Sequence, residues 1–293
     1  MKTIILSIIG ILIILHIFDQ KETKATDDVN SLLVNSIKDL NPLKTYHLWT
    51  YIEAEEPTKQ IQLLNNYIDI PVYLKQCLDK MSGNLTILTP INIEKFIPGF
   101  PIHMSKSSPL SLKKRTDILF AFILEKYGGI CISPGTIVYN LTEPLREVYI
   151  NDMVTFGSST PVNTGSKSPY YPDTYIIGSK PNTELISNYK QKLLYTTFKN
   201  SAEILSECLQ EKEYKTKHYG PKFVGTHDMN NNKLTLSDYL NQTKINYLSK
   251  KDHLAITLPY NELINNNEYR WFLNLSEEQF NNSNLEIIRL LKN

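Results

Sequence analysis

The pattern of apolar and polar positions predicts that the folded part of the chain begins with a strand, a helix and a second strand. Residues 46–52 are rich in aromatic and β-branched side chains, which is typical of a strand. From Pro71 onward apolar residues recur at helical spacing as far as Gly83, and residues 85–88 form a short apolar run. Because this order implies a right-handed crossover between parallel strands, the pattern predicts an α/β fold.

The next helix is expected from Ser108-Pro109 to Tyr127. Serine is a good helix cap, proline fits the first turn, and Gly128-Gly129 ends the helix. Residues 118–124 are apolar on every side, so we expect this helix to be largely buried. The pattern then predicts, in order, a strand at 130–132, a turn at Ser133-Pro134-Gly135 and a strand at 136–139.

Beyond Pro144 the apolar pattern is weaker. It predicts strands at 153–157 and 174–178 and helices at 184–194, 203–211 and 277–291. Residues 158–172 are rich in Ser, Thr, Pro, Gly and Tyr, and connections of that length tend to be functional or disordered. Since there is no internal repeat and no sign of a second domain, we expect a single domain over 43–293, preceded by a linker over 26–42.

The N-terminal segment, residues 1–25, is a membrane-targeting element by composition. Residues 4–18 are apolar apart from Ser7 and His16, and Lys2 precedes them. The run is shorter than the roughly 20 residues of a spanning helix, so a signal anchor and a cleaved signal peptide both remain open. The slight positive excess before the run favours a type II orientation.

This orientation predicts a protein of the secretory pathway, either held in the Golgi or ER membrane or secreted. The membrane is then a partner only if the N-terminal segment is not cleaved. Five N-x-S/T sites fit a lumenal glycoprotein, at Asn84, Asn140, Asn241, Asn274 and Asn281.

Charge and cysteine content exclude some classes of function. The 293 residues include 41% apolar residues, enough for one substantial core, and carry a formal net charge of +1. Lys and Arg form no basic stripe, so we expect no nucleic-acid partner. The three cysteines, Cys77, Cys131 and Cys208, lack the spacing of a zinc site, and either one disulfide with a free thiol or three buried thiols fits them.

Residues 113–138 carry a family resemblance. Their sequence, KKRTDILFAFILEKYGGICISPGTIV, resembles the pattern R-x-D-x-x-R-x-x-x-L-x-x-Y-G-G-I-W-L-D-x-D-T-I-V of capsular-polysaccharide-synthesis proteins and of the sugar-binding region of related glycosyltransferases. Residues 47–53, followed by Pro57, are similar to that family's I-W-T-Y-W-E…P opening, and residues 176–182 resemble a later segment. The resemblance covers roughly residues 46–195.

The resemblance implies a GT-A-like nucleotide-sugar-binding domain with a mixed, mainly parallel central sheet flanked by helices. It also implies transfer of a sugar from a nucleotide-sugar donor to the hydroxyl of a glycan or lipid acceptor. Residues matching the family's substrate-binding positions are Trp49 and Tyr51 at the nucleotide end, Arg115 and Asp117 at the donor sugar, Gly128 and Gly129 where the backbone passes the ligand, and His227 in a downstream loop. Each also has a structural reading: Trp49 as core packing, Asp117 as a partner of the helix dipole in the first turn or of Arg115, the glycines as a helix stop and His227 as a solvated loop residue.

The sequence departs from the family at the metal site. The two metal-binding aspartates correspond to Ser133 and Gly135, which supply no carboxylate, so a Mn²⁺ or Mg²⁺ cofactor is doubtful. The second basic residue of the helix corresponds to Phe120. The neighbouring Lys113, Lys114 and Arg115 are candidate substitutes that could neutralise a diphosphate.

Three hypotheses follow from this departure. The first is a glycosyltransferase-like protein in which Asp173 or Asp228 activates the acceptor hydroxyl. The second is a non-catalytic protein that binds glycans or nucleotide sugars. The third is a structural protein whose pocket has filled with side chains, for which a buried Phe120 in the site would be the sign.

Overall fold

The computed structural model describes residues 47–53, 70–81, 85–104, 108–158, 171–196, 198–247 and 253–292. All of them belong to one compact unit, residues 46–293. The predicted targeting segment, the linker, the site at Asn84 and most of the loop at 158–172 lie outside the described residues.

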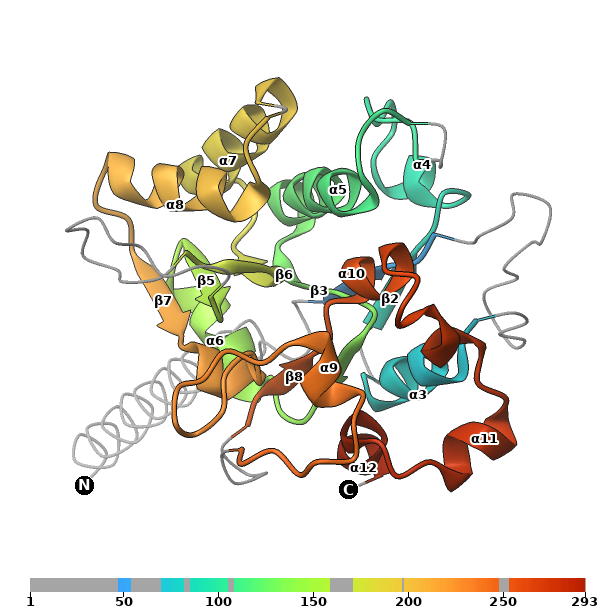
Figure 1. Cartoon of the computed structure of the whole chain (residues 1–293). Coiled ribbons are helices and arrows are strands. Elements are labelled where there is room, and N and C mark those ends of the chain that lie inside the picture. The colour runs from blue at the N-terminus through green and yellow to red at the C-terminus, as the bar shows by residue number, and fades with distance from the viewer. Residues whose placement is uncertain are drawn as a thin grey trace, which may run out of the picture. The chain divides into compact units, whose positions relative to one another are not determined.

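A six-stranded mixed sheet is the centre of this unit (Figure 1). Its strands are β1 (Leu48–Tyr51), β2 (Leu85–Leu88), β3 (Gly129–Ile132), β5 (Met153–Phe156), β6 (Asp173–Ser179) and β7 (Thr216–Tyr219), in the spatial order β2-β1-β3-β6-β5-β7. Strand β6 is antiparallel to both neighbours, and the other pairings are parallel. The predicted fold class, an α/β domain with a mixed, mainly parallel sheet flanked by helices, is confirmed.

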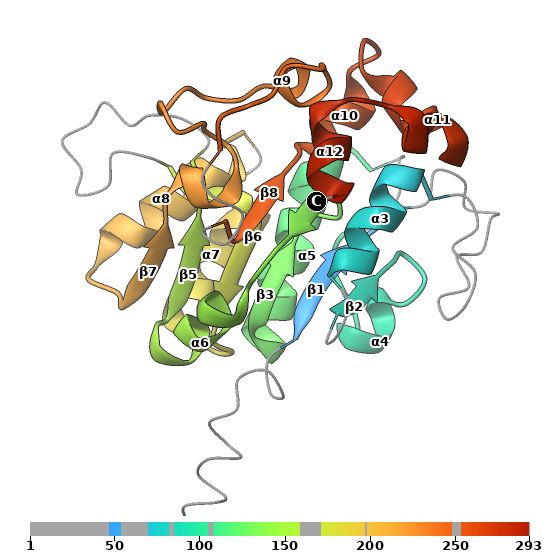
Figure 2. The same cartoon turned by 90° about the horizontal axis from the view of Figure 1, so that it is seen from below.

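The helices of the described residues lie on both faces of this sheet (Figure 2). They are α3 (Val72–Lys80), α4 (Ile93–Phe96), α5 (Leu112–Tyr127), α6 (Thr142–Ile150), α7 (Glu184–Tyr195), α8 (Ser201–Glu211), α9 (Leu236–Tyr239), α10 (Tyr260–Asn265), α11 (Glu277–Asn282) and α12 (Glu286–Lys292), with the short 3₁₀ turns η1 (Pro221–Val224) and η2 (Arg270–Asn274). One face is covered by α5, α7 and α8, and the other by α3, α6 and the C-terminal helices (Figure 1).

Each face of the sheet has its own apolar core because successive side chains of a strand point to opposite sides. In β3, Ile130 and Ile132 pack in the core beside α3 and α6, whereas Cys131 packs in the core beside α5 and α7. This is why the central strands are continuously apolar instead of alternating. All three cysteines are buried free thiols, so of the two alternatives the structure supports thiols.

Helix α5 is the element that connects the core to the candidate site. It is capped by the Ser111 hydroxyl, which accepts the backbone N–H of Lys114 at 3.2 Å, so it begins three residues later than predicted. The prediction of a largely buried helix is confirmed, and burial extends to the charged side chains of its first turns. The helix ends at Gly128, whose φ of +67° favours glycine.

One prediction needs correction, and two features of the fold were not predicted. Strand β4 (Thr136–Val138) pairs with β8 (Ala255–Thr257) in a separate two-stranded sheet. The local pattern could not show this pairing, because the two strands lie more than a hundred residues apart in sequence. The helix predicted at 277–291 is two helices, since Ser283 is extended between them in a run of short polar residues that compete for backbone hydrogen bonds. Helix α6 was not predicted, because the apolar pattern after Pro144 is weak. Pro144 lies in the first turn of this helix, where proline is tolerated.

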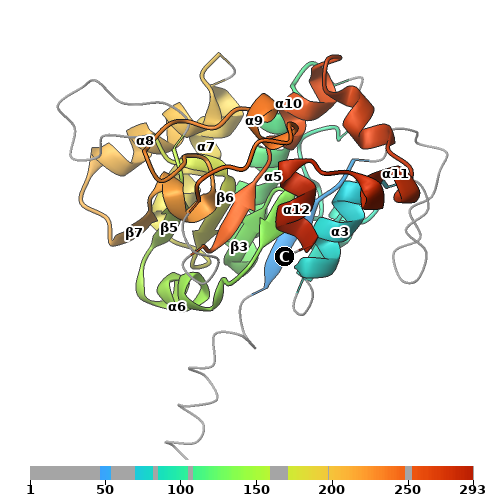
Figure 3. The same ribbon diagram turned by 60° about the horizontal axis from the view of Figure 1, so that its bottom comes forward.

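The C-terminal segments place α9 and α10 at the edge of the main sheet toward which β1 and β5 point (Figures 2 and 3). The carboxyl ends of β1, β3, β5 and β7 therefore meet these helices at one edge, together with the amino end of β6. In open α/β sheets this is the edge where ligands bind. Among the described residues, no helix has the length and apolar character needed to cross a bilayer.

Candidate functional site

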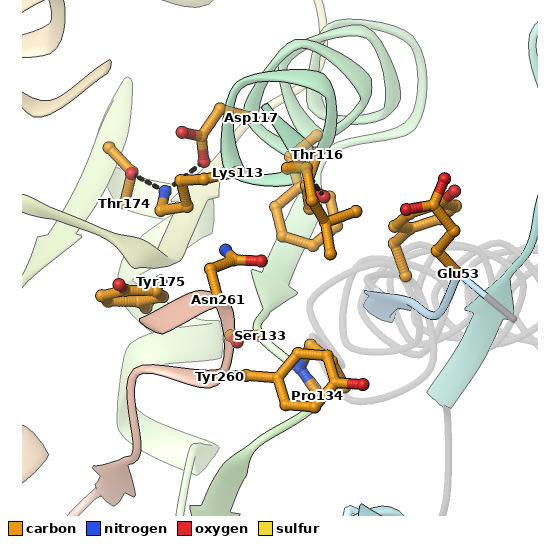
Figure 4. A pocket seen from close by; sticks show the side chains of 13 residues that line it. Glu53, Lys113, Thr116, Asp117, Ser133, Pro134, Thr174, Tyr175, Tyr260 and Asn261 are labelled. Carbon is orange, nitrogen blue, oxygen red and sulfur yellow. Dashed lines mark hydrogen bonds and ion pairs between the residues drawn. The ribbon is translucent and has the colours of Figure 1, made fainter. Parts of the chain in front are cut away.

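Two adjoining cavities lie at this edge of the sheet. The β1–β3 cavity is bounded by Tyr51 at the end of β1, Glu53 just after it, Ser133 after β3, the first half of α5, and Tyr260 of α10 (Figure 4). Its volume is about 20 Å³. That is room for about one water molecule.

The β5–β6 cavity is larger, with a volume of about 230 Å³. It is bounded by Ser158 after β5, Asp173 at the start of β6, Asn200 and Ser201 at the start of α8, and Thr257 at the end of β8. Four residues line both cavities and form a shared wall: Lys113, Asp117, Thr174 and Tyr175.

The shared wall is built around an ion pair on one face of α5. The Lys113 ammonium lies 2.5 Å from Asp117 Oδ1 one helical turn away, and it also donates to the Thr174 hydroxyl (Figure 4). The same ammonium lies 4.9 Å from the centre of the Tyr175 ring. Asp117 Oδ2 is buried and has no hydrogen-bond partner in the described structure.

The three consecutive basic residues of α5 point in three directions, since each residue turns about 100° around a helix axis. Only Lys113 faces the cavities. Lys114 donates to the carbonyl oxygens of Thr196 and Lys199, at 2.9 and 3.4 Å, and its burial lowers the pKa of its ammonium group. Arg115 lines neither cavity.

Arg115 is held by Glu53 in a buried ion pair. Its Nη2 atom lies 2.9 and 2.7 Å from the two carboxylate oxygens of Glu53, and Nη1 donates to the Leu110 carbonyl. The two side chains are 4% and 7% exposed, so the pair is almost fully removed from water. The guanidinium is therefore neutralised within the protein and lines neither cavity, so its role at the donor sugar stays a prediction from the resemblance.

Tyr51 and Ser133 are matched positions that do line the β1–β3 cavity. The Tyr51 hydroxyl is buried without a hydrogen-bond partner, and burial raises its pKa, so it remains protonated at all ordinary pH values. The Ser133 backbone N–H donates to the Tyr175 carbonyl at 2.7 Å, which fixes the turn after β3 against β6.

The segment Ser133–Gly135 does not fit a metal ion. Gly135 lines neither cavity, and a Cβ there would lie 3.2 Å from both the Leu258 carbonyl oxygen and the Tyr260 Cβ. Among the described residues, no group of three His, Cys, Asp or Glu side chains is arranged to hold a metal. Phe120 is 2% exposed and lines the β1–β3 cavity at the position where the family has a basic residue. This is the sign expected of a structural protein whose pocket has filled with side chains.

Trp49, Gly128 and Gly129 lie away from the cavities. The Trp49 indole is 3% exposed, donates to the Gly128 carbonyl at 3.0 Å and packs against Phe96 and Tyr127. Gly129 has a φ of +101°, and a Cβ there would overlap the His47 carbonyl oxygen. These residues lie at the amino end of β3, opposite to the edge that holds the cavities, so the structure gives them a packing role.

The downstream loop brings Thr226, but not His227, to the β5–β6 cavity. The His227 ring is buried, and this lowers its pKa, so it is neutral near pH 7. Of the two candidate bases, Asp228 lies outside both cavities, and hydrogen bonds from Asn232 lower its pKa. Asp173 lines the β5–β6 cavity, and burial raises its pKa to about 6.

Several lining residues have no signal in the sequence motif. Thr174, Tyr175, Tyr260 and Thr257 come from β6, α10 and the end of β8, which meet α5 only in the folded protein. Lys113 is different, because the sequence does indicate its role. It stands four residues before Asp117 on a predicted helix, and this spacing predicts an ion pair.

Comparisons with known proteins show little. No family model matches the sequence, and no curated protein sequence is significantly similar to it. The solved structure of a 4-diphosphocytidyl-2C-methyl-D-erythritol synthase from Anaerococcus prevotii is weakly similar, with 11% identity and a TM-score of 0.30 over 66% of this chain and 92% of that one. At that score the likeness says nothing about the site, and the resemblance to capsular-polysaccharide-synthesis proteins depends on the motif residues alone.

Proposed function

We propose that this chain is a glycosyltransferase-like protein that binds the sugar of a nucleotide-sugar donor beside Asp117 and transfers it without a metal ion. One observation carries the proposal: Asp117 Oδ2 is buried and unpartnered on the wall shared by both cavities. A buried acceptor left without a donor costs about 1–3 kcal/mol. A sugar hydroxyl that donates a hydrogen bond to this oxygen would remove that cost.

Other unpartnered groups support a polyhydroxylated ligand at this site. The Tyr51 hydroxyl in the β1–β3 cavity and the Thr257 hydroxyl in the β5–β6 cavity are both buried without partners. Each can donate to a sugar oxygen or accept from a sugar hydroxyl. Together with Asp117 they provide hydrogen-bonding groups on both sides of the shared wall.

The proposal assigns the charge of the leaving diphosphate to Lys113. The residues at 133–135 do not fit a divalent cation, and Lys114 and Arg115 are bound elsewhere. Lys113 lines both cavities, and its side chain is 27% exposed, so it can approach a ligand without leaving a deeply buried position. An ammonium placed near the leaving group lowers the cost of the developing negative charge.

A second candidate function is binding of a sugar or glycan without catalysis. The small volume of the β1–β3 cavity favours it, because about 20 Å³ between Phe120, Ser133 and Tyr260 leaves no room for a diphosphate. Under this alternative the β5–β6 cavity still binds a sugar, but no donor is consumed. Transfer therefore requires α10 to move away from this cavity when the donor binds.

Release of nucleoside diphosphate separates the two functions. The full-length chain would be incubated with UDP-glucose, UDP-galactose, UDP-N-acetylglucosamine or GDP-mannose and with methyl glycosides as acceptors, in EDTA or in Mn²⁺. We expect release of UDP or GDP at the same rate in both conditions. Binding of a sugar without any release would establish the non-catalytic alternative, and release only with Mn²⁺ would contradict the metal-free site.

The proposed location is the lumen of the secretory pathway or the outside of the cell. Of the four acceptor sites within the described residues, Asn140, Asn274 and Asn281 are exposed and Asn241 is partly buried. Exposed acceptor sites are compatible with glycosylation in that compartment.

A further inference from the structure

We infer that the β5–β6 cavity is the acceptor compartment and that Asp173 takes the proton of the acceptor hydroxyl. This inference rests on the proposed transfer reaction and names the second substrate and the residue that activates it. The acceptor would be a carbohydrate hydroxyl, and it would approach the donor sugar across the wall formed by Lys113 and Asp117.

The position of Asp173 follows from the topology of the sheet. Strand β6 runs against its neighbours, so its first residue lies at the same edge as the carboxyl ends of β3 and β5. The register of β5 and β6 shifts at Thr155 and Phe156, and Phe156 pairs with Asp173. Such irregularities re-aim side chains at sheet edges. Asp173 lines the β5–β6 cavity and not the β1–β3 cavity.

The lining of the β5–β6 cavity fits a sugar. Hydroxyl and amide groups come from Ser158, Ser201, Asn200, Thr226 and Thr257, and Tyr175 and Tyr239 also line the cavity. Thr257 is 2% exposed, and its hydroxyl has no hydrogen-bond partner among the described residues. A buried hydroxyl without a partner is expected where a ligand supplies the hydrogen bond. A cavity that combines hydrogen-bonding groups with aromatic side chains is suited to a polyhydroxylated ring.

The groups around Asp173 leave it available as a base. Its Oδ1 atom accepts the Tyr175 backbone N–H at 2.8 Å, which holds the carboxylate in place. The charged groups that line the same cavity are Lys113, Asp117, Lys233 and Glu262. Burial is the main cause of the raised pKa of about 6, opposed by Lys113 and reinforced by Asp117 and Glu262. The carboxylate is therefore ionised near pH 7 and is basic enough to accept a proton.

The chemical step balances within these groups. The acceptor oxygen forms a bond to the anomeric carbon of the donor sugar while its proton passes to the Asp173 carboxylate. The bond between that carbon and the diphosphate oxygen breaks, and its electron pair leaves with the nucleoside diphosphate. Lys113 neutralises part of the charge on the leaving group, and Asp173 returns its proton to water after the product leaves.

The test compares Asp173→Asn with Asp228→Asn in the full-length chain. Both substitutions remove one carboxylate, but Asp228 lies in a loop outside the cavities. We expect Asp173→Asn to lower turnover by at least about a hundredfold while donor affinity, measured by calorimetry, stays within about threefold. Asp228→Asn should turn over donor at the wild-type rate. Because the base must be ionised, wild-type turnover should fall about tenfold per pH unit below about 6.

The other outcomes would contradict the role of Asp173, the acceptor assignment or the transfer reaction itself. Turnover by Asp173→Asn at the wild-type rate and with the wild-type pH profile would overturn the role of Asp173 and leave the proposed transferase standing. Loss of turnover together with loss of donor binding would mean that Asp173 supports the donor site instead of the acceptor. A wild-type chain that consumes no donor would overturn both the transfer reaction and this inference.

Discussion

The two ends of β3 carry residues of the same sequence motif, but their surroundings differ. At the amino end, Gly128 and Gly129 are packed against Trp49 and the backbone of His47, and the polar atom of the indole is paired. At the carboxyl end, the turn at Ser133 borders a cavity with unpartnered polar atoms on Tyr51 and Asp117. At the amino end the polar atom of the indole is paired within the protein, whereas at the carboxyl end two buried polar atoms have no partner among the described residues.

This difference shows that neighbours in a motif need not share a site. Strand β3 has four residues, so its ends are roughly 10 Å apart. The glycine pair and the residues of the turn are four or more positions apart in sequence, and the strand places them at opposite edges of the sheet. A motif can therefore combine packing residues with residues that line a cavity, and only the fold separates them.

The largest effect is expected from Trp49→Ala. Removing a buried tryptophan should lower the free energy of unfolding by about 3–5 kcal/mol. Urea unfolding would measure the loss, and Trp271→Ala, at a residue that is 44% exposed, should cost much less. Because Trp49 lines neither cavity, the folded fraction should bind sugar normally. A specific loss of nucleotide-sugar affinity with unchanged stability would instead place Trp49 at the ligand.

A smaller effect of opposite sign is expected from Asp173→Asn at the other edge. The pKa of Asp173 is about 6 in the folded protein and about 4 in the unfolded chain. The folded state therefore binds more protons between pH 4 and 6, and the stability associated with this group is lost as the pH rises through 6. At pH 7.5 the variant should be more stable than the wild type by on the order of 2–3 kcal/mol, with little difference at pH 4.

Thermal unfolding at the two pH values would measure this change. The variant Asp228→Asn should show no such gain, because hydrogen bonds lower the pKa of Asp228 in the folded protein. A wild-type chain that is more stable than Asp173→Asn at pH 7.5 would mean that the carboxylate stabilises the fold and is not held there for a ligand.

The fold was largely predictable from sequence because local patterns decide it. The apolar runs at β1, β2 and β3, the length of α5 and the glycine stop each depend on residues that are adjacent in the chain. The same reasoning could not find that β4 pairs with β8, since that pairing depends on contacts between distant segments.

The candidate site was predictable only in part. Tyr51, Asp117 and Ser133 lie at the cavities because each stands where a parallel strand or the helix between strands meets the ligand-binding edge. Arg115 does not, since its partner Glu53 is 62 residues away and neutralises it in the core. Likewise, Tyr260 closes over Gly135 from a helix whose position no local pattern indicates.

The most direct test of the metal-free sugar site is a calorimetric titration of the full-length chain with the four nucleotide sugars in EDTA, beside Asp117→Asn. The exposed α3 residue Asp79, changed to Asn, is the matched control. The account predicts that the wild type and Asp79→Asn bind a donor equally in EDTA and in Mn²⁺, whereas Asp117→Asn binds at least about tenfold more weakly, or about 1.4 kcal/mol. Equal binding by Asp117→Asn, or wild-type binding that requires Mn²⁺, would contradict it.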